Sequence, residues 1–480
     1  MSPPADGTPL LRRRGILLPF QARRSVAWTF TLPPGAGALR LGLTFSPPTV
    51  DRVRNLLTLT LFDPAGFRGA GHRHAPRQEV LVAPDRATPG FVPGPLSPGP
   101  WTVELDCHCV LPSDSGGVEY ELEVDSLPAL PDSAEALVPS QPAAPPSGAV
   151  AGAAPRWLRG DLHLHSTHSD GRWSVEEIVD YARMRRLDFL AVTEHNTSSA
   201  LPELRAAAAR AAPPLVVVPG IELTTFWGHA NALGVPGWVD WRVAPPVGFR
   251  RESGDDSLIL DDPAASLPET GTMAAAAAAV HEQGGTFVVN HPRSIGYPDC
   301  TGCRWEFGDD SAGYADLLEV WNGPWRRQNV EGLALWDAWL NAGRRLPACA
   351  GSDGHLRPQR WDTVGLTCVF AVPEPGAILA AARAGASYLT SGPVLLLRDP
   401  APGARLPADA DAVSLTVADL PGPADVYLVA DGARVARRSL RGDGELRLPL
   451  PAGSVRWCRV ELYAQGRDVP LALSNAIFPA

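Results

Sequence analysis

The feature that most constrains this chain is a change of hydrophobic pattern that occurs twice along its length. Residues 25–126 alternate apolar and polar positions in short runs such as SVAWTFTL and LLTLTLF, and residues 396–480 return to that alternation. Between them, short apolar runs such as LVVVPG and TFVVNH alternate with stretches of helical periodicity. The pattern predicts an α/β layered or barrel region flanked by two all-β regions.

The two changes of pattern give the expected domain boundaries. We expect an N-terminal β-sandwich accessory domain at 1–130, a Pro/Ala-rich linker at 131–155, the α/β region at 156–395 and a C-terminal β-sandwich at 396–480. Several strands of the α/β region are continuously apolar, which is typical of parallel strands covered on both faces. Ser174 followed by Glu177 forms a capping box that predicts the start of a helix.

Composition excludes several classes of function. All 42 basic residues are arginine, so the sequence has no lysine nucleophile, pyridoxal lysine or Walker-type lysine. The net charge of −10 and the lack of a basic stripe argue against a nucleic-acid partner. We see no secretion signal and no apolar run near the roughly twenty residues that cross a bilayer. We expect a cytoplasmic protein with a small-molecule substrate, no membrane association and no obligate protein partner.

The seven cysteines have neither the number nor the spacing of a disulfide framework. Cys300 and Cys303 form a lone C-x-x-C, and Cys107 and Cys109 flank His108 in an expected strand. A structural zinc site needs a second pair at a usual spacing, and neither pair has one. We interpret both pairs as loop or packing thiols, and the sequence leaves a function for Cys300 and Cys303 open.

Histidines and carboxylates recur at the ends of the apolar runs in the α/β region. His163 and His165 are spaced i, i+2, so on a strand both imidazoles face the same side and reach one metal ion. The ends of successive parallel strands converge on one mouth of a barrel, where residues distant in sequence meet. Six histidines and three carboxylates suit a cluster of two or three divalent ions. These nine residues are His163, His165, Asp170, His195, Glu222, His229, His291, Asp353 and His355.

The order of these motifs resembles that of a known family. The runs DLHLHSTHSDG, TEHN, GIEL, NHP and GSDGH are similar to those of the PHP (polymerase and histidinol phosphatase) metallohydrolases over about half the chain. The phrases FWGHANALG, FVVNHP and SYLTSGP look closer to the CehA/McbA branch, which includes carbaryl-hydrolase-like proteins. The resemblance implies a distorted (β/α)7 barrel with a trinuclear metal centre at the carboxyl ends of its strands.

The resemblance also implies how the nine residues divide among three metals. The first metal would be held by His163, His165, Glu222 and Asp353. Glu222 would bridge to a second metal, which is completed by His229 and His291. The third metal would be held by Asp170, His195 and His355. A metal-bridging hydroxide held by Glu222 and Asp353 would then be the nucleophile.

Other polar residues near these motifs have less specific roles. Asn290 and Arg293 are candidate catalytic helpers, and Arg326 is a third. Glu194 stands where many members of the family carry Asp, and we interpret it as support for His195. Two further histidines lie off the family pattern and are expected at the surface or behind the ligands, namely His168 and His281.

The charge of such a site indicates the substrate. Three divalent ions, three carboxylates and a bridging hydroxide leave a net charge of about +2, which favours an anion, so phosphoester hydrolysis is the leading hypothesis. The same hydroxide can attack a carbonyl, so a carboxylester or carbamate hydrolase of the carbaryl type is the alternative. Tryptophans such as Trp227, Trp321 and Trp325 would favour it as an aromatic wall, although core packing explains them too.

Two questions stay open at this level. A non-catalytic binding scaffold is the second alternative, but the complete ligand set argues against it. The mixed nitrogen and oxygen ligands suit manganese, zinc or iron equally, so the sequence does not decide which metal is bound.

Overall fold

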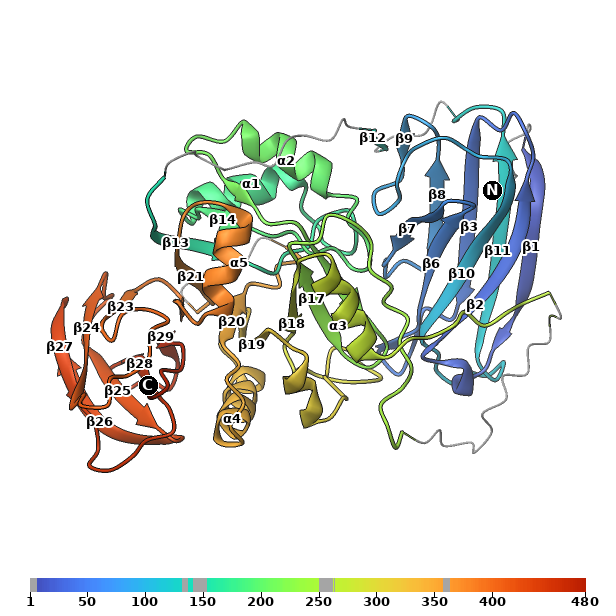
Figure 1. Ribbon diagram of the computed structural model, residues 1–480. Helices are drawn as coiled ribbons and strands as arrows, with labels where there is room; N and C mark the ends of the chain where they lie inside the picture. The colour runs from blue at the N-terminus through green and yellow to red at the C-terminus, as the bar shows by residue number, and fades with distance from the viewer. Residues whose placement is uncertain (1–6, 132–136, 141–152, 250–261, 263, 357–362) are drawn as a thin grey trace.

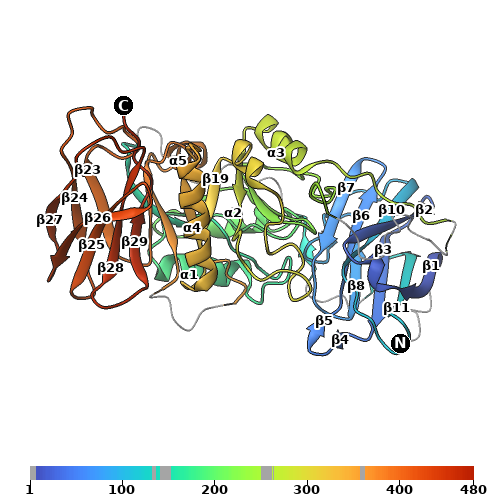
Figure 2. The same cartoon turned by 90° about the horizontal axis from the view of Figure 1, so that it is seen from below.

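The computed structural model describes residues 7–131, 137–140, 153–249, 262, 264–356 and 363–480. The chain forms an N-terminal β region (7–127), a central region (156–390) and a C-terminal β region (394–480), with the two β regions at opposite ends of the central one (Figures 1 and 2). Most of the expected linker at 131–155 lies outside the described residues. Within the described parts, no helix is long and apolar enough to cross a membrane.

Two antiparallel sheets share one core in the N-terminal β region. Alternation turns Leu41 of one sheet and Leu59 of the other into this core, where both are fully buried. The six-stranded sheet contains, in spatial order, β1 (Thr8–Leu17), β11 (Val118–Leu127), β3 (Ala38–Ser46), β8 (Arg77–Val82), β9 (Arg86–Ala87) and β12 (Val138–Pro139). The four-stranded sheet contains β2 (Arg24–Leu32), β10 (Gly99–Cys109), β6 (Leu56–Asp63) and β7 (Gly66–Gly71). A separate hairpin pairs β4 (Thr49–Val50) with β5 (Val53–Arg54), and the 3-10 helix η1 spans Pro19–Gln21.

The central region carries its strands in two sheets. The first contributes five strands to a larger sheet, in the order β15 (Val216–Val217), β14 (Phe189–Leu190), β13 (Arg156–Asp161), β21 (Leu366–Ala371) and β22 (Ser387–Thr390). The second has the order β16 (Gly220–Thr224), β17 (His229–Leu233), β18 (Thr286–Val289), β19 (Leu317–Asn322) and β20 (Ala348–Gly351). Buried residues of both sheets, among them Phe189 and Val288, belong to one core.

The described strands of the central region form two sheets and not one closed barrel. The two sheets are joined by isolated bridges, including His195 to Glu222 and Leu164 to Gly354, instead of by continuous ladders. Residues at the strand ends explain the break. Asn196, His291 and Asp353 have φ angles of 58°, 25° and 48°. A residue in the left-handed region cannot continue a strand, so the ladders end where the polar residues gather.

Five α-helices cover the two sheets of the central region in the part of the chain that the structure describes. The expected capping box is confirmed, because Ser174 and Glu177 exchange hydrogen bonds of 3.2 and 2.7 Å at the start of the first helix. The helices are α1 (Val175–Met184), α2 (Leu201–Ala209), α3 (Met273–Glu282), α4 (Arg327–Asn341) and α5 (Pro375–Arg383), with the 3-10 helix η2 at Asp309–Gly313. The protein is thus mixed α/β with a high content of sheet, as the pattern predicts.

The C-terminal β region continues the first central sheet. Strand β29 (Pro470–Ser474) pairs with β22, and the sheet runs on through β28 (Cys458–Ala464), β25 (Ala424–Ala430) and β26 (Ala433–Leu440). A second sheet of β23 (Val394–Asp399), β24 (Ala412–Ala418) and β27 (Gly444–Pro449) shares a core with it. Asp431 and Gly432, with φ angles of 50° and 90°, form the tight turn between β25 and β26. The chain therefore returns to the central sheet at its end.

Candidate metal centre

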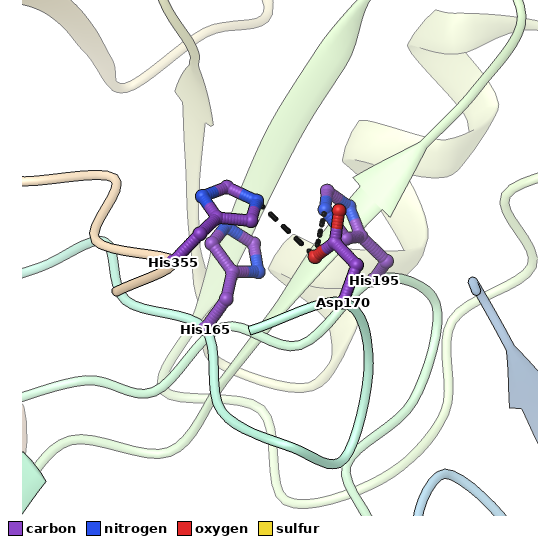
Figure 3. Close-up of side chains that lie close together, drawn as sticks. All are labelled: His165, Asp170, His195 and His355. Carbon is purple, nitrogen blue, oxygen red and sulfur yellow. Dashed lines mark ion pairs between the residues drawn. The ribbon is translucent and has the colours of Figure 1, made fainter. Parts of the chain in front are cut away.

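The nine residues expected as metal ligands lie together at the strand ends of the central region. Figure 3 shows four of them, with Oδ1 of Asp170 3.3 Å from Nε2 of His195 and 3.1 Å from Nε2 of His355. His165 stacks on both rings, with ring centroids 4.3 Å apart in each case. All nine residues fall into overlapping groups whose ligand atoms lie within 4.8 Å of one another. The structure therefore brings the expected set together.

Glu222 and Asp353 join these groups. Oδ1 of Asp353 lies 3.4 Å from Nε2 of His163 and 3.2 Å from Nε2 of His165. The two carboxylate oxygens of Glu222 lie 2.9–3.4 Å from ring nitrogens of five imidazoles, which belong to His163, His165, His195, His229 and His291. This central position fits the bridging role that the family resemblance implies for Glu222.

The hydrogen bonds of the imidazoles fit metal ligation. In four rings one N–H donates to a protein oxygen at 2.9–3.1 Å, which directs the other ring nitrogen toward the centre; these are His163, His229, His291 and His355. Several facing atoms are buried and have no hydrogen-bond partner among the described residues, namely Nε2 of His163, Nε2 of His165, Oδ1 of Asp170 and Oε2 of Glu222. Convergent lone pairs of this kind suit divalent cations.

The carboxylates and imidazoles of the cluster shift one another's pKa. Burial opposes the charged form of each carboxyl, yet the surrounding imidazoles hold the pKa of Glu222, Asp353 and Asp170 well below the usual range. Burial also opposes protonation of the rings, but Asp170 and Glu222 raise the pKa of His195 to about 10, and Asp170 raises that of His355 to about 9. The protons on His195 and His355 therefore occupy positions at which a metal ion would bind.

Two buried carboxylates that the sequence analysis missed support the cluster. Oε1 of Glu319 accepts from Nδ1 of His163 at 3.0 Å, and its Oε2 accepts from the backbone N–H of His291 at 3.0 Å. Asp161 accepts from Tyr181 and from the N–H of Ser352, at 2.8 and 2.9 Å. The sequence signal for Glu319 was an acid inside the otherwise apolar run LLEVW, but the sequence does not show that its partner is His163.

Glycine at position 351 makes room for this support. A Cβ at Gly351 would lie 2.5 Å from Cβ of His163 and 2.9 Å from Oε1 of Glu319. Any side chain there would push His163 away from its carboxylate partner.

The candidate helpers lie outside the cavity lining. Asn290 is buried and donates to Oε1 of Glu222 and to Asn231, each at 2.9 Å, so it orients a carboxylate. Arg293 forms a backbone bridge with Arg304 and is not among the described residues that line the cavity. Arg326 is exposed at the N-terminus of α4 and is not among those lining residues either. None of these residues is placed to contact a substrate in the cavity.

Glu194 supports the site differently from our expectation. Its carboxylate accepts from the backbone N–H of Ser166 at 2.9 Å and from the hydroxyls of Ser166 and Ser169. It therefore fixes the loop that carries Asp170, whereas Nδ1 of His195 contacts Glu222 at 2.9 Å.

Two histidines remain apart from the cluster. His168 is buried and contacts Ser199 at 2.8 Å and Glu203 at 3.2 Å, toward α2. His281 is exposed and pairs with Asp316 at 2.8 Å. Among the described residues, neither histidine shares a group of close ligand atoms with any of the nine.

The cysteines and tryptophans also have clear surroundings. Cys300 and Cys303 are joined by a disulfide in a loop that lines the cavity, while Cys107 and Cys109 are buried free thiols. Trp227 and Trp321 are packed in the core of the central region. No tryptophan is found among the described residues that line the cavity, so these residues provide no aromatic wall.

The three histidines outside the central motifs, which the sequence analysis did not use, also lie at this site. The ring of His72 lies 4.4 Å from that of His195 and 4.9 Å from that of His108, and Nε2 of His74 lies 3.5 Å from Oδ2 of Asp170. His72 and His74 follow β7 in the N-terminal β region. Their signal was the run GHRH within an all-β segment, but only the fold shows which region that segment faces.

A cavity of about 490 Å³ lies between the N-terminal β region and the central region. Its volume is within the usual range for a small-molecule site. One wall is the ligand cluster, and the other is the N-terminal β region with the disulfide loop. The lining from these latter parts comprises Arg52, Val53, Arg54, Leu56, His72, His74, Cys109, Pro298, Asp299, Cys300, Thr301 and Cys303. The ligand cluster is thus reached through a space that two regions build together.

The comparisons with known proteins point to phosphoester-processing enzymes. No family model matches the chain. It is 40% identical over 67 residues to the 5′-3′ exoribonuclease Rnm of Salmonella typhimurium, covering 14% of this chain and 23% of the relative. It is 39% identical over 79 residues to the 3′,5′-nucleoside bisphosphate phosphatase of Chromobacterium violaceum, covering 16% and 27%. The chain therefore spans about a quarter of the length of these curated relatives.

A solved structure covers more of the chain at lower similarity. A two-domain protein from Bacteroides vulgatus, described as containing a predicted PHP-like metal-dependent phosphoesterase, is 17% identical, with a TM-score of 0.40, over 67% of this chain and 96% of its own. The narrower CehA/McbA branch is not represented among these matches. The two curated relatives are named as an exoribonuclease and a phosphatase, and the similarity to each covers only a short segment.

Proposed function

We propose that this chain is a metal-dependent phosphoesterase that holds two or three divalent ions, manganese, zinc or iron, in the ligand cluster. The observation that carries the proposal is the convergence of six imidazoles and three carboxylates, several of whose facing atoms lack a hydrogen-bond partner among the described residues. Bound ions of this kind supply Lewis-acid activation of water and of phosphoryl oxygens. The similarity to a bisphosphate phosphatase and to exoribonucleases supports a phosphoester as the substrate.

The protein holds its ligands in place before any ion binds. Asn290 and Glu319 fix Glu222 and His163, and the carbonyls of Thr301 and Cys303 accept from His229 and His291 at 3.1 and 2.9 Å. Ligands that are oriented in advance pay little entropy on binding, and they keep their geometry as charge develops.

Two rings of the cluster are ready to bind without losing a proton. Burial lowers the pKa of His165, to about 3, and also lowers that of His229. Both rings are therefore neutral near pH 7 and offer lone pairs.

The finer parts of the proposal follow the family resemblance. We propose that the nine ligands divide among three ions, with Glu222 as the bridge, and that the central region is a distorted PHP barrel of the CehA/McbA branch. An anionic phosphoester suits a site of net charge of about +2. The exoribonuclease relatives leave a 5′-phosphorylated nucleic acid open beside a small molecule.

One assay panel tests the function. Purified protein with measured metal content is incubated with aryl phosphate mono- and diesters, a 5′-phosphorylated oligoribonucleotide, aryl acetates and N-methylcarbamates. We expect phosphoester turnover by the wild type and a loss of at least about 100-fold in His165→Ala, with reduced metal content, because His165 contributes to two ligand groups. His281→Ala, which removes an exposed histidine outside the cluster, should behave as the wild type.

The other outcomes identify the competing functions. Turnover confined to acetates or carbamates would replace the phosphoesterase by an ester or carbamate hydrolase. If the wild type holds its metal and turns over none of the substrates, the non-catalytic binding scaffold would be the remaining function.

A further inference from the structure

The wall of the cavity opposite the ligand cluster carries arginines. Outside the cluster, the charged residues of the described lining are Arg52, Arg54 and Asp299. Both arginines come from the β4–β5 hairpin of the N-terminal β region, and a guanidinium keeps its charge at any working pH. This wall therefore has a net positive charge that titration cannot remove.

Arg54 is held in place by a histidine that also faces the cluster. Its Nη1 lies 2.7 Å from Nδ1 of His74, and Nε2 of His74 lies 3.5 Å from Oδ2 of Asp170. Because a guanidinium can only donate, Nδ1 of His74 accepts and Nε2 carries the hydrogen. That hydrogen points at Asp170, so His74 in this tautomer links Arg54 to the cluster and does not offer a lone pair to a metal.

The hairpin that presents the two arginines has an uncommon backbone. Its turn residues, Asp51 and Arg52, have φ angles of 48° and 70°. Two consecutive left-handed residues define the tight hairpin turn for which Asn-Gly is preferred, and arginine adopts that conformation at a cost. Strain of this type persists where the fold imposes it, and it concentrates at binding sites.

The N-terminal β region is fixed against the central region by two hydrogen bonds. The hydroxyl of Thr301 donates to the carbonyl of His108 at 2.8 Å, and the hydroxyl of Thr197 donates to the carbonyl of Gly90 at 2.8 Å. The ring of His72 is buried and packs against that of His195, so it contributes to the contact between the two regions. The distance between the arginines and the ligand cluster is therefore set by the fold.

Charge on both walls determines what can lie between them. With divalent ions bound, the cluster side carries a net positive charge, so the arginines face another positive wall across a space of about 490 Å³. An anion with one charged group satisfies the cluster alone. A ligand with a second anionic group satisfies both walls, because arginine binds carboxylates and phosphates through paired N–H donors.

We propose that Arg52 and Arg54 form a second anion subsite, which binds an anionic group of the substrate other than the reacting phosphate. The N-terminal β region then selects phosphoesters with two anionic groups. This inference rests on the proposed phosphoesterase function and names the substrate class for the same cavity. The second group is a carboxylate or a phosphate.

Matched probes test the subsite. The substrates are 4-carboxyphenyl phosphate, 1,4-phenylene bisphosphate and 4-carbamoylphenyl phosphate, whose para substituent is neutral, with 4-carboxybenzylphosphonate and its carboxamide as ligands that are not hydrolysed. We expect Arg54→Gln and Arg52→Gln to raise KM for the doubly anionic substrates about tenfold and to change KM for the carboxamide less than about twofold. Metal content and kcat should stay at the wild-type level. Arg86→Gln, a change of an exposed arginine of the same region outside the cavity lining, should have no effect.

The outcomes separate the subsite from the proposed function. An equal rise in KM for substrates with a charged and with a neutral para substituent, or a loss of metal from Arg54→Gln, would overturn the subsite. Arg54 would then act on the cluster through His74. If no phosphoester is turned over, calorimetry compares the affinities of the two phosphonates and so tests the subsite without catalysis. A preference for the carboxylate that disappears in Arg54→Gln would support the subsite while the phosphoesterase function fails, and equal binding would overturn the subsite.

Discussion

The two β regions at the ends of this chain resemble each other in sequence pattern and differ in how they meet the central region (Figure 1). The N-terminal region places His72, His74 and Arg54 in the cavity lining. The C-terminal region extends the central sheet through the pairing of β29 with β22, and none of its described residues lines the cavity. One region is therefore part of the site, and the other is part of the scaffold.

Histidine content follows this difference. The N-terminal β region contains three histidines, all at the site, and residues 394–480 contain none. Strand alternation reports only that a segment is a sheet with one buried face. Side chains that alternation does not explain, such as these histidines, indicate which other region the sheet contacts.

The largest predicted effect distinguishes the histidines of the N-terminal region from those of the cluster. Burial lowers the pKa of His72 and His74, whereas Asp170 and Glu222 raise the pKa of His195 to about 10, and Asp170 raises that of His355 to about 9. Against the effect of burial, neighbouring carboxylates also raise the pKa of His163, well above its usual range, and that of His291. Near pH 7 at least three rings of the cluster, His163, His195 and His355, therefore hold protons that a metal must displace. Metal affinity should thus rise about tenfold per pH unit for each proton released.

Calorimetry in buffers of different ionisation enthalpy counts these protons. We expect at least three protons released per chain at pH 7, from His163, His195 and His355, and one fewer in His355→Gln. His74→Gln should release as many as the wild type, because its ring is neutral before the metal binds. Equal proton release by all three proteins would contradict the assignment.

The second prediction tests whether the C-terminal region serves only the scaffold. Arg459 of β28 is 2% exposed, donates to Glu461 at 2.7 and 2.9 Å, and contacts Asp337 of α4. Arg459→Met would remove the cation that Asp337 contacts and leave Glu461 paired only with Arg434, and breaking a buried ion pair costs about 3–5 kcal/mol. We expect the lower value, because the side chain of Asp337 is 21% exposed.

Denaturation and activity together measure this effect. The midpoint of urea unfolding should fall, while kcat/KM of the folded protein stays unchanged, because no described cavity residue belongs to the C-terminal region. Arg434→Met provides the control. Arg434 pairs with the same Glu461 but is 48% exposed, so its loss should cost less than about 1 kcal/mol. A changed kcat/KM in Arg459→Met would remove the distinction between the two β regions.

The third prediction concerns support that comes from neither β region. Glu319→Gln removes the carboxylate that accepts from Nδ1 of His163, at 3.0 Å. Losing such a partner of a ligating histidine weakens metal binding about 10- to 100-fold. Competition with a chelator measures the change. Glu203→Gln breaks a similar contact, of 3.2 Å, with His168 outside the cluster, and should leave metal affinity as in the wild type.

Glu319 also marks the limit of what sequence reasoning provides. The nine clustered residues were predicted because histidines and acids recur near the ends of apolar runs, and because the order of their motifs resembles that of the PHP family. Glu319 lies inside an apolar strand, and His74 lies in another region, so their proximity to the cluster depends on long-range packing. The distorted (β/α)7 barrel was implied by the same resemblance, and the left-handed conformation at His291 and Asp353 marks where the ladders end.

The smallest predicted effect tests how tightly the N-terminal region is fixed to the site. Arg23 donates to both carboxylate oxygens of Glu306, at 2.8 and 3.1 Å, and its guanidinium lies 4.6 Å from the ring centroid of Trp227. Arg23→Gln removes a two-point ion pair and a cation–π contact between the regions, which together contribute about 1–2 kcal/mol.

Because Arg23 lies between the regions, its loss should change catalysis as well as stability. We expect a rise in KM of about threefold for doubly anionic phosphoesters, since the arginine wall would be held less firmly against the cluster. Arg40→Gln is the matched control, because Arg40 bonds Asp125 within the N-terminal region and should lower stability without changing KM. If both variants raised KM equally, the effect would come from general loosening of the N-terminal region, and the contact at Arg23 would have no separate part in positioning it.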